Sequence, residues 1–218
     1  DTFTVGSGTD TISDLGNGGA DILTVAAGAI ANARMGANWV ATAATSNSGT
    51  ATINANNFNV NLAAATGTSG WNVSNSGNST GVTLIGSAKN NVLTGGLGAE
   101  TLNGGAGNDT LDGGLGNDTL TGGAGIDTAS YASAASAVTV NLATTTAQAT
   151  GGAGSDTLAT IENLTGSAFN DTLTGNNLAN VLDGGLGSDI LIGGLGNDQL
   201  DGGDGSDTAS YSTSTLGV

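Results

Sequence analysis

The sequence contains no cysteine and no histidine among its 218 residues. Zinc, copper and iron-sulfur centres are held by thiolate and imidazole ligands, so the absence of both argues against all three. No disulfide framework can form, and the thiol content gives no information on redox compartment. A metal bound by this chain would be held by oxygen atoms, which favours a hard cation such as Ca²⁺.

Basic residues are almost absent. Arg34 and Lys89 stand against 18 acidic residues, and the net charge is -16. Nucleic acid and anionic membrane surfaces are bound through clustered Lys and Arg, which argues against both as partners. No apolar run approaches 18 residues and no signal peptide is visible, so nothing predicts membrane insertion. Because the chain begins with Asp1, we expect it to be a segment of a longer protein.

Large apolar side chains are also scarce. Only 3% of the residues are aromatic, whereas 40 residues are glycine. This composition is poor material for a compact globular core, and ordering a glycine costs more backbone entropy than ordering other residues. An unpatterned chain of this kind would stay disordered. Something other than a thick apolar core has to stabilise the fold.

The chain is built from nine-residue units. Two uninterrupted runs of five units cover residues 86–130 and 166–210, and one further unit covers residues 151–159. The runs lie 80 residues apart, and this offset also relates the VNL segments at 60–62 and 140–142. The first run reads GSAKNNVLT, GGLGAETLN, GGAGNDTLD, GGLGNDTLT and GGAGIDTAS, and the second reads GSAFNDTLT, GNNLANVLD, GGLGSDILI, GGLGNDQLD and GGDGSDTAS.

Each unit combines a turn with a short strand. We number its positions 1 to 9 and predict that the glycines at positions 1, 2 and 4 adopt positive φ and bring carbonyl oxygens together. The aspartate at position 6 adds a carboxylate to this turn. Positions 7 to 9 form a strand whose aliphatic residue at position 8 points inward. The inward residues are Leu102, Leu111, Leu120, Leu173, Leu182, Leu191 and Leu200.

Two units make a coil of eighteen residues, so equivalent turns are predicted to stack. Asp109 then faces Asp127 and Asp189 faces Asp207, with Asp118 and Asp198 on the opposite edges. Carboxylates this close repel each other unless a cation lies between them. Calcium accepts six to eight oxygen ligands in flexible geometry, whereas magnesium requires stricter octahedral geometry. The pattern therefore predicts several Ca²⁺ ions and folding that is coupled to their binding.

These units resemble the RTX family of calcium-dependent proteins, which Gram-negative bacteria export by type I secretion. The resemblance implies an all-β fold, a right-handed parallel β-roll stabilised by calcium, preceded here by an irregular β-rich N-terminal segment. It also implies that the first six residues of each unit bind calcium through backbone carbonyls and the aspartate. The implied turns are Gly104–Asp109, Gly113–Asp118, Gly122–Asp127, Gly184–Asp189, Gly193–Asp198 and Gly202–Asp207, together with Asp156 and, on a partial match, Asp171.

Several units depart from the pattern. Position 6 is Asn91, Glu100 or Asn180 in three of them, so we expect the early coils of each run to bind calcium weakly or not at all. Position 8 is Ala129 or Ala209 in the last unit of each run, which predicts that the roll tapers or is capped there. The predicted division is an N-terminal segment at 1–57, repeat modules at 58–131 and 132–211, and the start of a further segment at 212–218.

No catalytic constellation is apparent. Gly77–Gly81 matches the G-x-S-x-G nucleophile pattern, but the chain has no histidine to activate the serine. The carboxylates recur at every turn, whereas a catalytic pair is a singular arrangement in a cleft. Trp39 and Trp71 could stack on carbohydrate, but packing inside the fold is favoured for both. We therefore expect no enzymatic activity in this segment.

Three hypotheses for function follow. The leading one is a calcium-dependent structural module of a secreted or cell-surface bacterial protein, such as a surface-layer protein or an adhesin, which folds on calcium after export. The second is the C-terminal RTX region of a secreted protease, lipase or polysaccharide-acting enzyme whose catalytic domain lies outside this segment. The third is a subunit of a lattice or filament in which calcium also bridges neighbouring chains.

Overall fold

The structure is a computed structural model that describes residues 1–17 and 20–210. All regular elements in this part of the chain are β-strands. It accordingly contains no helix of the length and apolarity needed to cross a membrane. Tyr211 and the predicted segment 212–218 lie outside the described residues.

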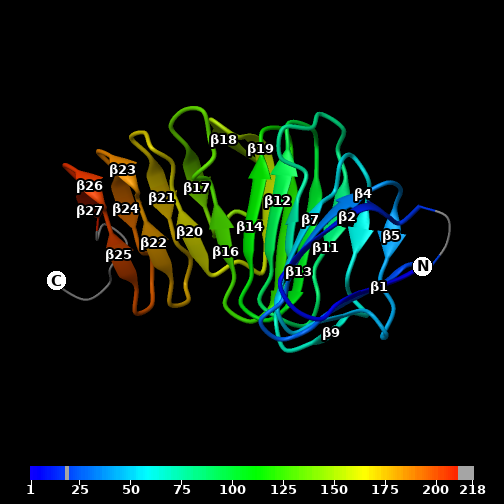
Figure 1. Cartoon of the computed structure of the whole chain (residues 1–218). Coiled ribbons are helices and arrows are strands. Elements are labelled where there is room, and N and C mark those ends of the chain that lie inside the picture. Colours follow the sequence, from blue (N-terminus) through cyan, green and yellow to red (C-terminus); the bar gives the residue numbers. More distant parts are fainter. Residues whose placement is uncertain (18–19, 211–218) are drawn as a thin grey trace.

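Successive strands stack in parallel along one axis, with β1 and β27 at opposite ends of the stack (Figure 1). The molecule is therefore a parallel β-solenoid, as the repeat pattern predicted. A ten-stranded sheet runs through the whole stack. Its strands, in order, are β2 (Thr9–Leu15), β4 (Ile30–Met35), β7 (Thr50–Asn54), β10 (Asn72–Ser74), β12 (Val92–Gly96), β14 (Thr110–Gly114), β16 (Thr128–Ser130), β20 (Asn163–Thr165), β22 (Val181–Asp183) and β25 (Gln199–Asp201).

Four smaller sheets complete the coils. A seven-stranded sheet contains β5 (Trp39–Val40), β8 (Val60–Asn61), β11 (Thr83–Ile85), β13 (Thr101–Ala106), β15 (Thr119–Ala124), β19 (Gly154–Ala159) and β18 (Gln148–Gly151). Two four-stranded sheets contain β1 (Thr2–Val5), β3 (Ile22–Val25), β6 (Ser46–Asn47) and β9 (Thr66–Gly67), and β17 (Thr139–Asn141), β21 (Thr172–Thr174), β24 (Ile190–Ile192) and β27 (Thr208–Ser210). A pair is formed by β23 (Leu186–Gly187) and β26 (Asp204–Gly205).

The coils are of two kinds. Residues 2–74 form three-strand coils, in which the register repeats at about twenty residues, as in the pairing of Ile30 with Thr50. From residue 22 on, the chain visits three sheets per coil, whereas the described residues of the first coil contribute only β1 and β2. Residues 83–130 and 163–210 form two-strand coils with a repeat of eighteen residues, as in the pairing of Thr110 with Thr128. The expected β-rich N-terminal segment is thus a stack of further coils on the same solenoid.

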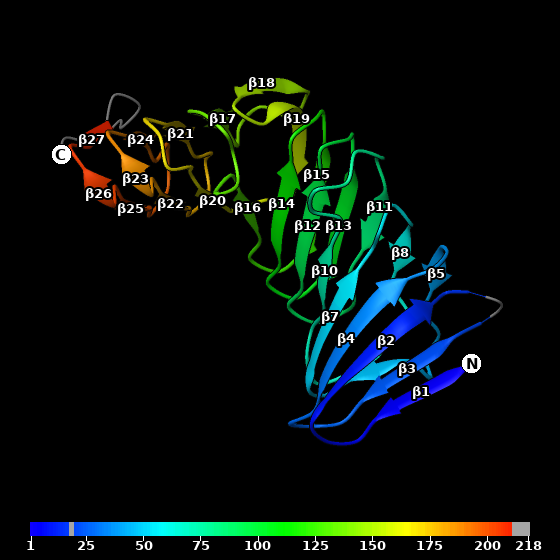
Figure 2. The same ribbon diagram turned by 45° about the horizontal axis from the view of Figure 1, so that its top comes forward.

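The two nonad runs are joined through the ten-stranded sheet. β16 pairs directly with β20, with Ala129 beside Leu164, so the stack continues past Ala129. Residues 131–162 instead add β19 and, outermost, β18 to the seven-stranded sheet and start the next sheet with β17. β17 and β18 lie side by side at this change of sheet (Figure 2).

This junction shifts the second run relative to the first. Val60 pairs with Leu84, but Val140 pairs with Leu173, not with the sequence equivalent Leu164. Leu84 lies in the seven-stranded sheet and Leu164 in the ten-stranded sheet, because residues 131–162 contribute no strand to the latter. Residues that lie 80 positions apart are therefore equivalent in sequence but do not occupy equivalent positions in the fold. The proposed module boundaries stay a sequence-based prediction.

The core lies between the sheets. Six of the seven predicted position-8 leucines are buried as predicted, and Leu200, in the last described coil, is partly buried against the same core. In the three-strand coils, strands bury alternate residues, as in β4 and β7, which is the pattern of a half-buried strand. Trp39 and Trp71 lie in this part of the core, with ring centroids 6.4 Å apart in an edge-to-face arrangement. Their predicted packing role is confirmed.

Candidate metal centre

The glycines of each turn serve two different purposes. In the turn Gly104–Asp109, positions 2 and 4 have positive φ, 103° at Gly105 and 109° at Gly107, whereas Gly104 does not. The prediction of positive φ at position 1 is therefore wrong for the six turns called full-motif turns below, whereas Gly151, at position 1 of the unit 151–159, has a φ of 76°. The full-motif turns are 104–109, 113–118, 122–127, 184–189, 193–198 and 202–207. Position 1 has to be glycine because a Cβ on Gly104 would lie 2.3 Å from Oδ2 of Asp109. The same closeness, 2.3 to 2.5 Å, holds at Gly113, Gly122, Gly184, Gly193 and Gly202.

The position-6 aspartates fold back into the solenoid. Six of the eight predicted ligand aspartates are at most 1–2% exposed, namely Asp109, Asp118, Asp127, Asp156, Asp171 and Asp189. Asp198 is half-buried. Asp207, in the last described coil, is exposed, although its Oδ1 still accepts the N–H of Asp189 at 3.0 Å.

One oxygen of each buried aspartate links two coils. Oδ1 of Asp109 accepts the backbone N–H of Asn91 at 2.6 Å, and Oδ1 of Asp127 accepts that of Asp109 at 2.7 Å. Asp189 accepts from Asp171 in the same way, at 2.7 Å. The predicted stacking at eighteen residues is thus confirmed in the hydrogen bonds as well as in the strand register. It leaves the second carboxylate oxygen free for another partner.

In four of the six full-motif turns that second oxygen is buried and has no donor. Oδ2 of Asp109, Asp118, Asp127 and Asp189 is buried without a hydrogen-bond partner. Acceptors converge on the same place: a Cβ on Gly104 would also lie 2.6 Å from the carbonyl oxygen of Gly122 in the next coil. An unpaired buried carboxylate is costly unless a cation or a proton compensates it. The donor set consists of oxygen atoms alone, which fits Ca²⁺.

Burial also changes the acidity of these groups. It raises the pKa of Asp118 to about 7, with a further contribution from the nearby carboxylates of Asp156 and Glu100. Burial likewise raises the pKa of Asp109, Asp127 and Asp189 above the ordinary range. Burial thus disfavours the ionised form of all four carboxylates, and a bound cation would offset that penalty.

Two predicted ligands have other partners. Oδ1 of Asp156 accepts the N–H of Asp118 at 2.9 Å, but Oδ2 accepts the hydroxyl of Thr150 at 3.1 Å. The unit of Asp156 begins the antiparallel hairpin of β18 and β19, so its turn differs from the others. Both oxygens of Asp171 are hydrogen-bonded to Ser167.

Sequence analysis missed Glu162. Its Oε2 accepts the N–H of Asp127 at 2.8 Å, so it takes the place of the position-6 aspartate in the coil after Asp127. It lies 35 residues beyond Asp127 in the sequence, outside any nine-residue frame, and its longer side chain reaches the same point. Only the register of β16 on β20 reveals it.

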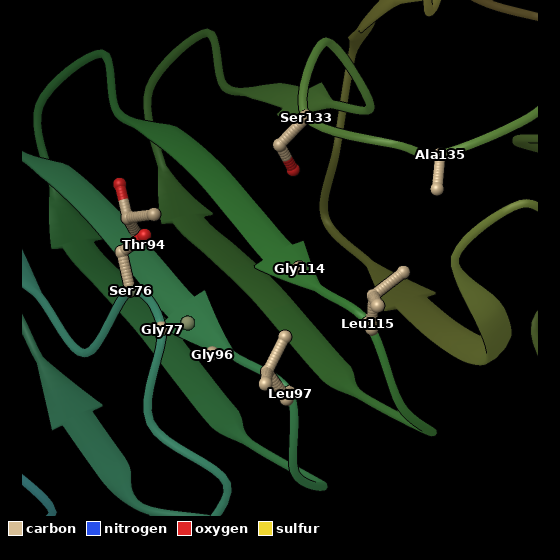
Figure 3. A pocket seen from close by; sticks show the side chains of 10 residues that line it. Ser76, Gly77, Thr94, Gly96, Leu97, Gly114, Leu115, Ser133 and Ala135 are labelled. Atoms are coloured by element: carbon tan, nitrogen blue, oxygen red, sulfur yellow. The ribbon is translucent and has the colours of Figure 1, made fainter.

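One surface pocket borders one of these turns, because Gly114 and Leu115 of turn Gly113–Asp118 line it. It has a volume of about 170 Å³ and is lined by small residues with Leu97 and Leu115, none of them titratable (Figure 3). Gly77 of the G-x-S-x-G match borders it, whereas Ser79 is exposed and does not line it. The motif match therefore has no catalytic surroundings.

No three His, Cys, Asp or Glu side chains gather in a metal-binding group within residues 1–17 and 20–210. A cation in these turns must therefore take most of its ligands from backbone carbonyls, with one or two carboxylates. No curated protein matches the chain. The family model of the RTX calcium-binding nonapeptide repeat (4 copies) matches residues 83–111, 94–129 and 174–209, all within the two-strand coils. Residues 83–129 and 174–209 therefore carry RTX calcium-binding nonapeptide repeats, and the chain contains a calcium-binding RTX β-roll.

Proposed function

We propose that the chain is a calcium-dependent structural module of a secreted or cell-surface protein of a Gram-negative bacterium, of the surface-layer or adhesin kind. It has no enzymatic activity of its own and folds fully on calcium after export. The six full-motif turns that end in Asp109, Asp118, Asp127, Asp189, Asp198 and Asp207 bind the ions. RTX repeat proteins are typically secreted.

The unpartnered Oδ2 atoms of Asp109, Asp118, Asp127 and Asp189 carry this proposal. Within the described residues no Lys or Arg side chain forms an ion pair with a carboxylate, so the protein offers no internal cation to these turns. External calcium at millimolar concentration would supply the charge, whereas calcium inside a cell would not. The chain would therefore stay incompletely folded until it leaves the cell.

A scaffold suits the shape as well as the chemistry. Each coil contacts its neighbours in the stack, so the solenoid is a rod whose length grows with the number of repeats. Sequencing of the parent reading frame tests the structural role: an upstream H-E-x-x-H motif, or a G-x-S-x-G motif with a downstream histidine, would contradict it in favour of a secreted enzyme.

A calcium titration followed by far-ultraviolet circular dichroism tests the calcium dependence. We expect a cooperative gain of β-structure at about 0.1 to 1 mM calcium, the affinity range of extracellular modules. Magnesium at the same concentrations is the matched control and is expected to give no gain, because its octahedral geometry is stricter. A spectrum that calcium leaves unchanged would contradict the proposed function.

A further inference from the structure

The first turn of each nonad run has serine at position 2 where the full motif has glycine. These are Ser87 in turn 86–91 and Ser167 in turn 166–171. Neither serine has positive φ, and neither does the residue at position 4, Lys89 or Phe169. The backbone of both turns therefore differs from that of the full-motif turns, in which positions 2 and 4 have positive φ.

Serine provides Asp171 with the donors that the other aspartates lack. The N–H of Ser167 donates to Oδ2 at 2.5 Å, and its hydroxyl lies 2.8 Å from Oδ1 and 3.0 Å from Oδ2. Oδ1 also accepts the N–H of Val138 at 2.7 Å. Both oxygens of this buried carboxylate are thus satisfied by the protein itself. The charge needs no cation to complete its contacts.

Asp189 is the matched comparison, because it is stacked directly on Asp171 and is equally buried, at 1% exposure. Its Oδ2 has no partner. In its turn the N–H of position 2 belongs to Gly185 and donates to Oδ1 of Asp183 at 3.1 Å, not to Asp189. Positive φ at Gly185 thus accompanies the loss of the position-2 backbone donor, which in the turn of Asp171 binds Oδ2.

The first run reaches the same result with an amide. A Cβ on Gly86 would lie 2.7 Å from Nδ2 of Asn91, so this nitrogen takes the place that Oδ2 occupies in the full-motif turns. It donates to the carbonyl oxygens of Ser87 and Gly104, both at 3.3 Å, and to that of Lys89, and lies 3.1 Å from Oδ1 of Asp109. The amide thereby bridges oxygens of two successive coils, as a cation would.

A third turn follows this pattern. In turn 175–180 the N–H of Asn176, at position 2, donates to Oδ1 of Asn180 at 2.8 Å. Nδ2 of Asn180 donates to the carbonyl oxygen of Glu162 at 2.7 Å. Neither Asn176 nor Leu178 has positive φ. The side chain at position 6 again closes the turn, because it accepts one hydrogen bond and donates another.

We propose that turns 86–91 and 166–171 take no cation and are closed by hydrogen bonds, so that each nonad run starts from a turn that is complete without calcium. Calcium-dependent coils then assemble on an edge that already has the correct register. Asp171, which the family resemblance implied as a ligand, is on this assignment a structural residue. The inference rests on the proposed calcium-dependent function.

Two matched substitutions test it. The number of Ca²⁺ ions bound at saturation is counted by native mass spectrometry for Asp171→Asn and Asp189→Asn, with calcium as the only added metal. We expect Asp171→Asn to bind as many ions as the wild-type chain and Asp189→Asn to bind at least one fewer. Asp118→Asn gives a second reference for loss of an ion if Asp189→Asn does not fold.

A gain of a site tests the same idea in the opposite direction. The double substitution Ser167→Gly with Phe169→Gly converts GSAFND into GGAGND, the sequence of turn 104–109. We expect it to bind one additional ion and to need more calcium for folding than the wild-type chain, since Asp171 loses its donors. Ala168→Gly in the same turn controls for added backbone flexibility and is expected to leave the ion count unchanged.

The outcomes separate the inference from the proposed function. A wild-type chain that binds no calcium would overturn the proposed function. A wild-type chain that binds calcium, combined with loss of an ion in Asp171→Asn, would overturn only the inference. An unchanged ion count in the Ser167→Gly, Phe169→Gly chain would also overturn it, because the serine would then not be what closes the turn.

Discussion

The three-strand coils and the two-strand coils share one solenoid but are stabilised differently. The three-strand coils contain both tryptophans and several other large buried side chains, among them Leu15, Met35 and Ile53. On most of their strands the two-strand coils contain a single buried leucine or alanine, and they also contain the buried aspartates. Only four of the 18 acidic residues precede residue 100.

This difference shows that coil shape and source of stability are linked. A third strand widens the coil, so that Trp39 and Trp71 fit inside, and burial of such side chains stabilises by roughly 25 cal/mol for each Å² of apolar surface. A two-strand coil has room for a single layer of leucine. On the proposed function, a cation bound at the turns supplies the stability that this coil lacks in apolar burial.

The buried asparagines of the three-strand coils find hydrogen-bond partners within the protein. Asn47 and Asn75 are fully buried, but their amides are hydrogen-bonded. Asn47 donates to the carbonyl oxygen of Gly70 at 2.5 Å, and Asn75 donates to that of Thr80 at 3.1 Å. A neutral amide brings its own donors, whereas an aspartate at such a place would not. These turns are complete without metal.

Removal of calcium should therefore unfold the two-strand coils and leave the three-strand coils folded. In excess chelator we expect amide hydrogen exchange to stay slow in residues 22–74 and to become fast in residues 104–130 and 184–210. Mass action gives roughly 2.7 kcal/mol for a site at a calcium concentration of 100 times its Kd, so protection in these coils should fall by about 100-fold or more.

Two results would contradict the proposed difference in calcium dependence between the two kinds of coil. Equal loss of protection in residues 22–74 would show that the three-strand coils depend on the same ions. Retained protection in residues 104–130 would show that the buried carboxylates are compensated in some other way. Addition of calcium to the same sample should restore the original exchange pattern, and this serves as the control for irreversible damage.

Core substitutions should sharpen the comparison at a smaller scale. Ile53→Ala and Leu111→Ala each remove a fully buried side chain and should cost about 2 to 5 kcal/mol. We expect Ile53→Ala to lower stability both in chelator and in calcium. We expect Leu111→Ala to lower it in calcium only, because the proposed function predicts that the coil of Leu111 is unfolded in chelator.

Denaturant unfolding measures this difference, because tryptophan fluorescence reports on the three-strand coils and circular dichroism on the whole chain. Val40→Ala is the control: Val40 is 65% exposed, so its loss should change stability by no more than about 0.5 kcal/mol. An effect of Leu111→Ala in chelator equal to that in calcium would contradict the assignment of Leu111 to a metal-dependent coil.

The sequence was most informative where its period is fixed. The nine-residue spacing predicted the inward leucines and the stacking of Asp109 on Asp127, because each unit is one strand and one turn of constant length. It could not predict which oxygen of the carboxylate stays free. That depends on the direction of the peptide at position 2, which a serine or a glycine sets through φ.

The three-strand coils and residues 131–162 have no fixed sequence period from which their strands could be predicted. The three-strand coils vary between twenty and about twenty-two residues, as in the pairings of Ile22 with Thr2 and of Thr24 with Ser46, so their period is hidden in the sequence. Glu162 was missed for a similar reason, since residues 131–162 form an irregular coil. Such coils are defined by tertiary contacts and not by local spacing.

A change of pH should have the smallest effect on the stability of the two-strand coils. The folded-state pKa of Asp118 is raised to about 7, and the pKa values of Asp109, Asp127 and Asp189 are raised in the same direction. Between the unfolded pKa near 4 and these higher values the folded chain binds more protons than the unfolded chain, so stability falls as pH rises. In chelator, the two-strand coils should therefore be most stable near pH 4 and lose stability toward pH 7.

Calcium should reverse this order, because the cation needs ionised carboxylates and competes with the protons. Circular dichroism in chelator between pH 4 and pH 8, repeated in 5 mM calcium as a chosen condition of about ten times the expected Kd, measures both trends. Asp118→Asn should flatten the pH dependence in chelator, since an amide does not titrate. The three-strand coils should show little change, since their described residues contain no buried unpaired carboxylate oxygen. Stability of the two-strand coils that rises with pH in chelator would show that protons do not replace calcium in these turns.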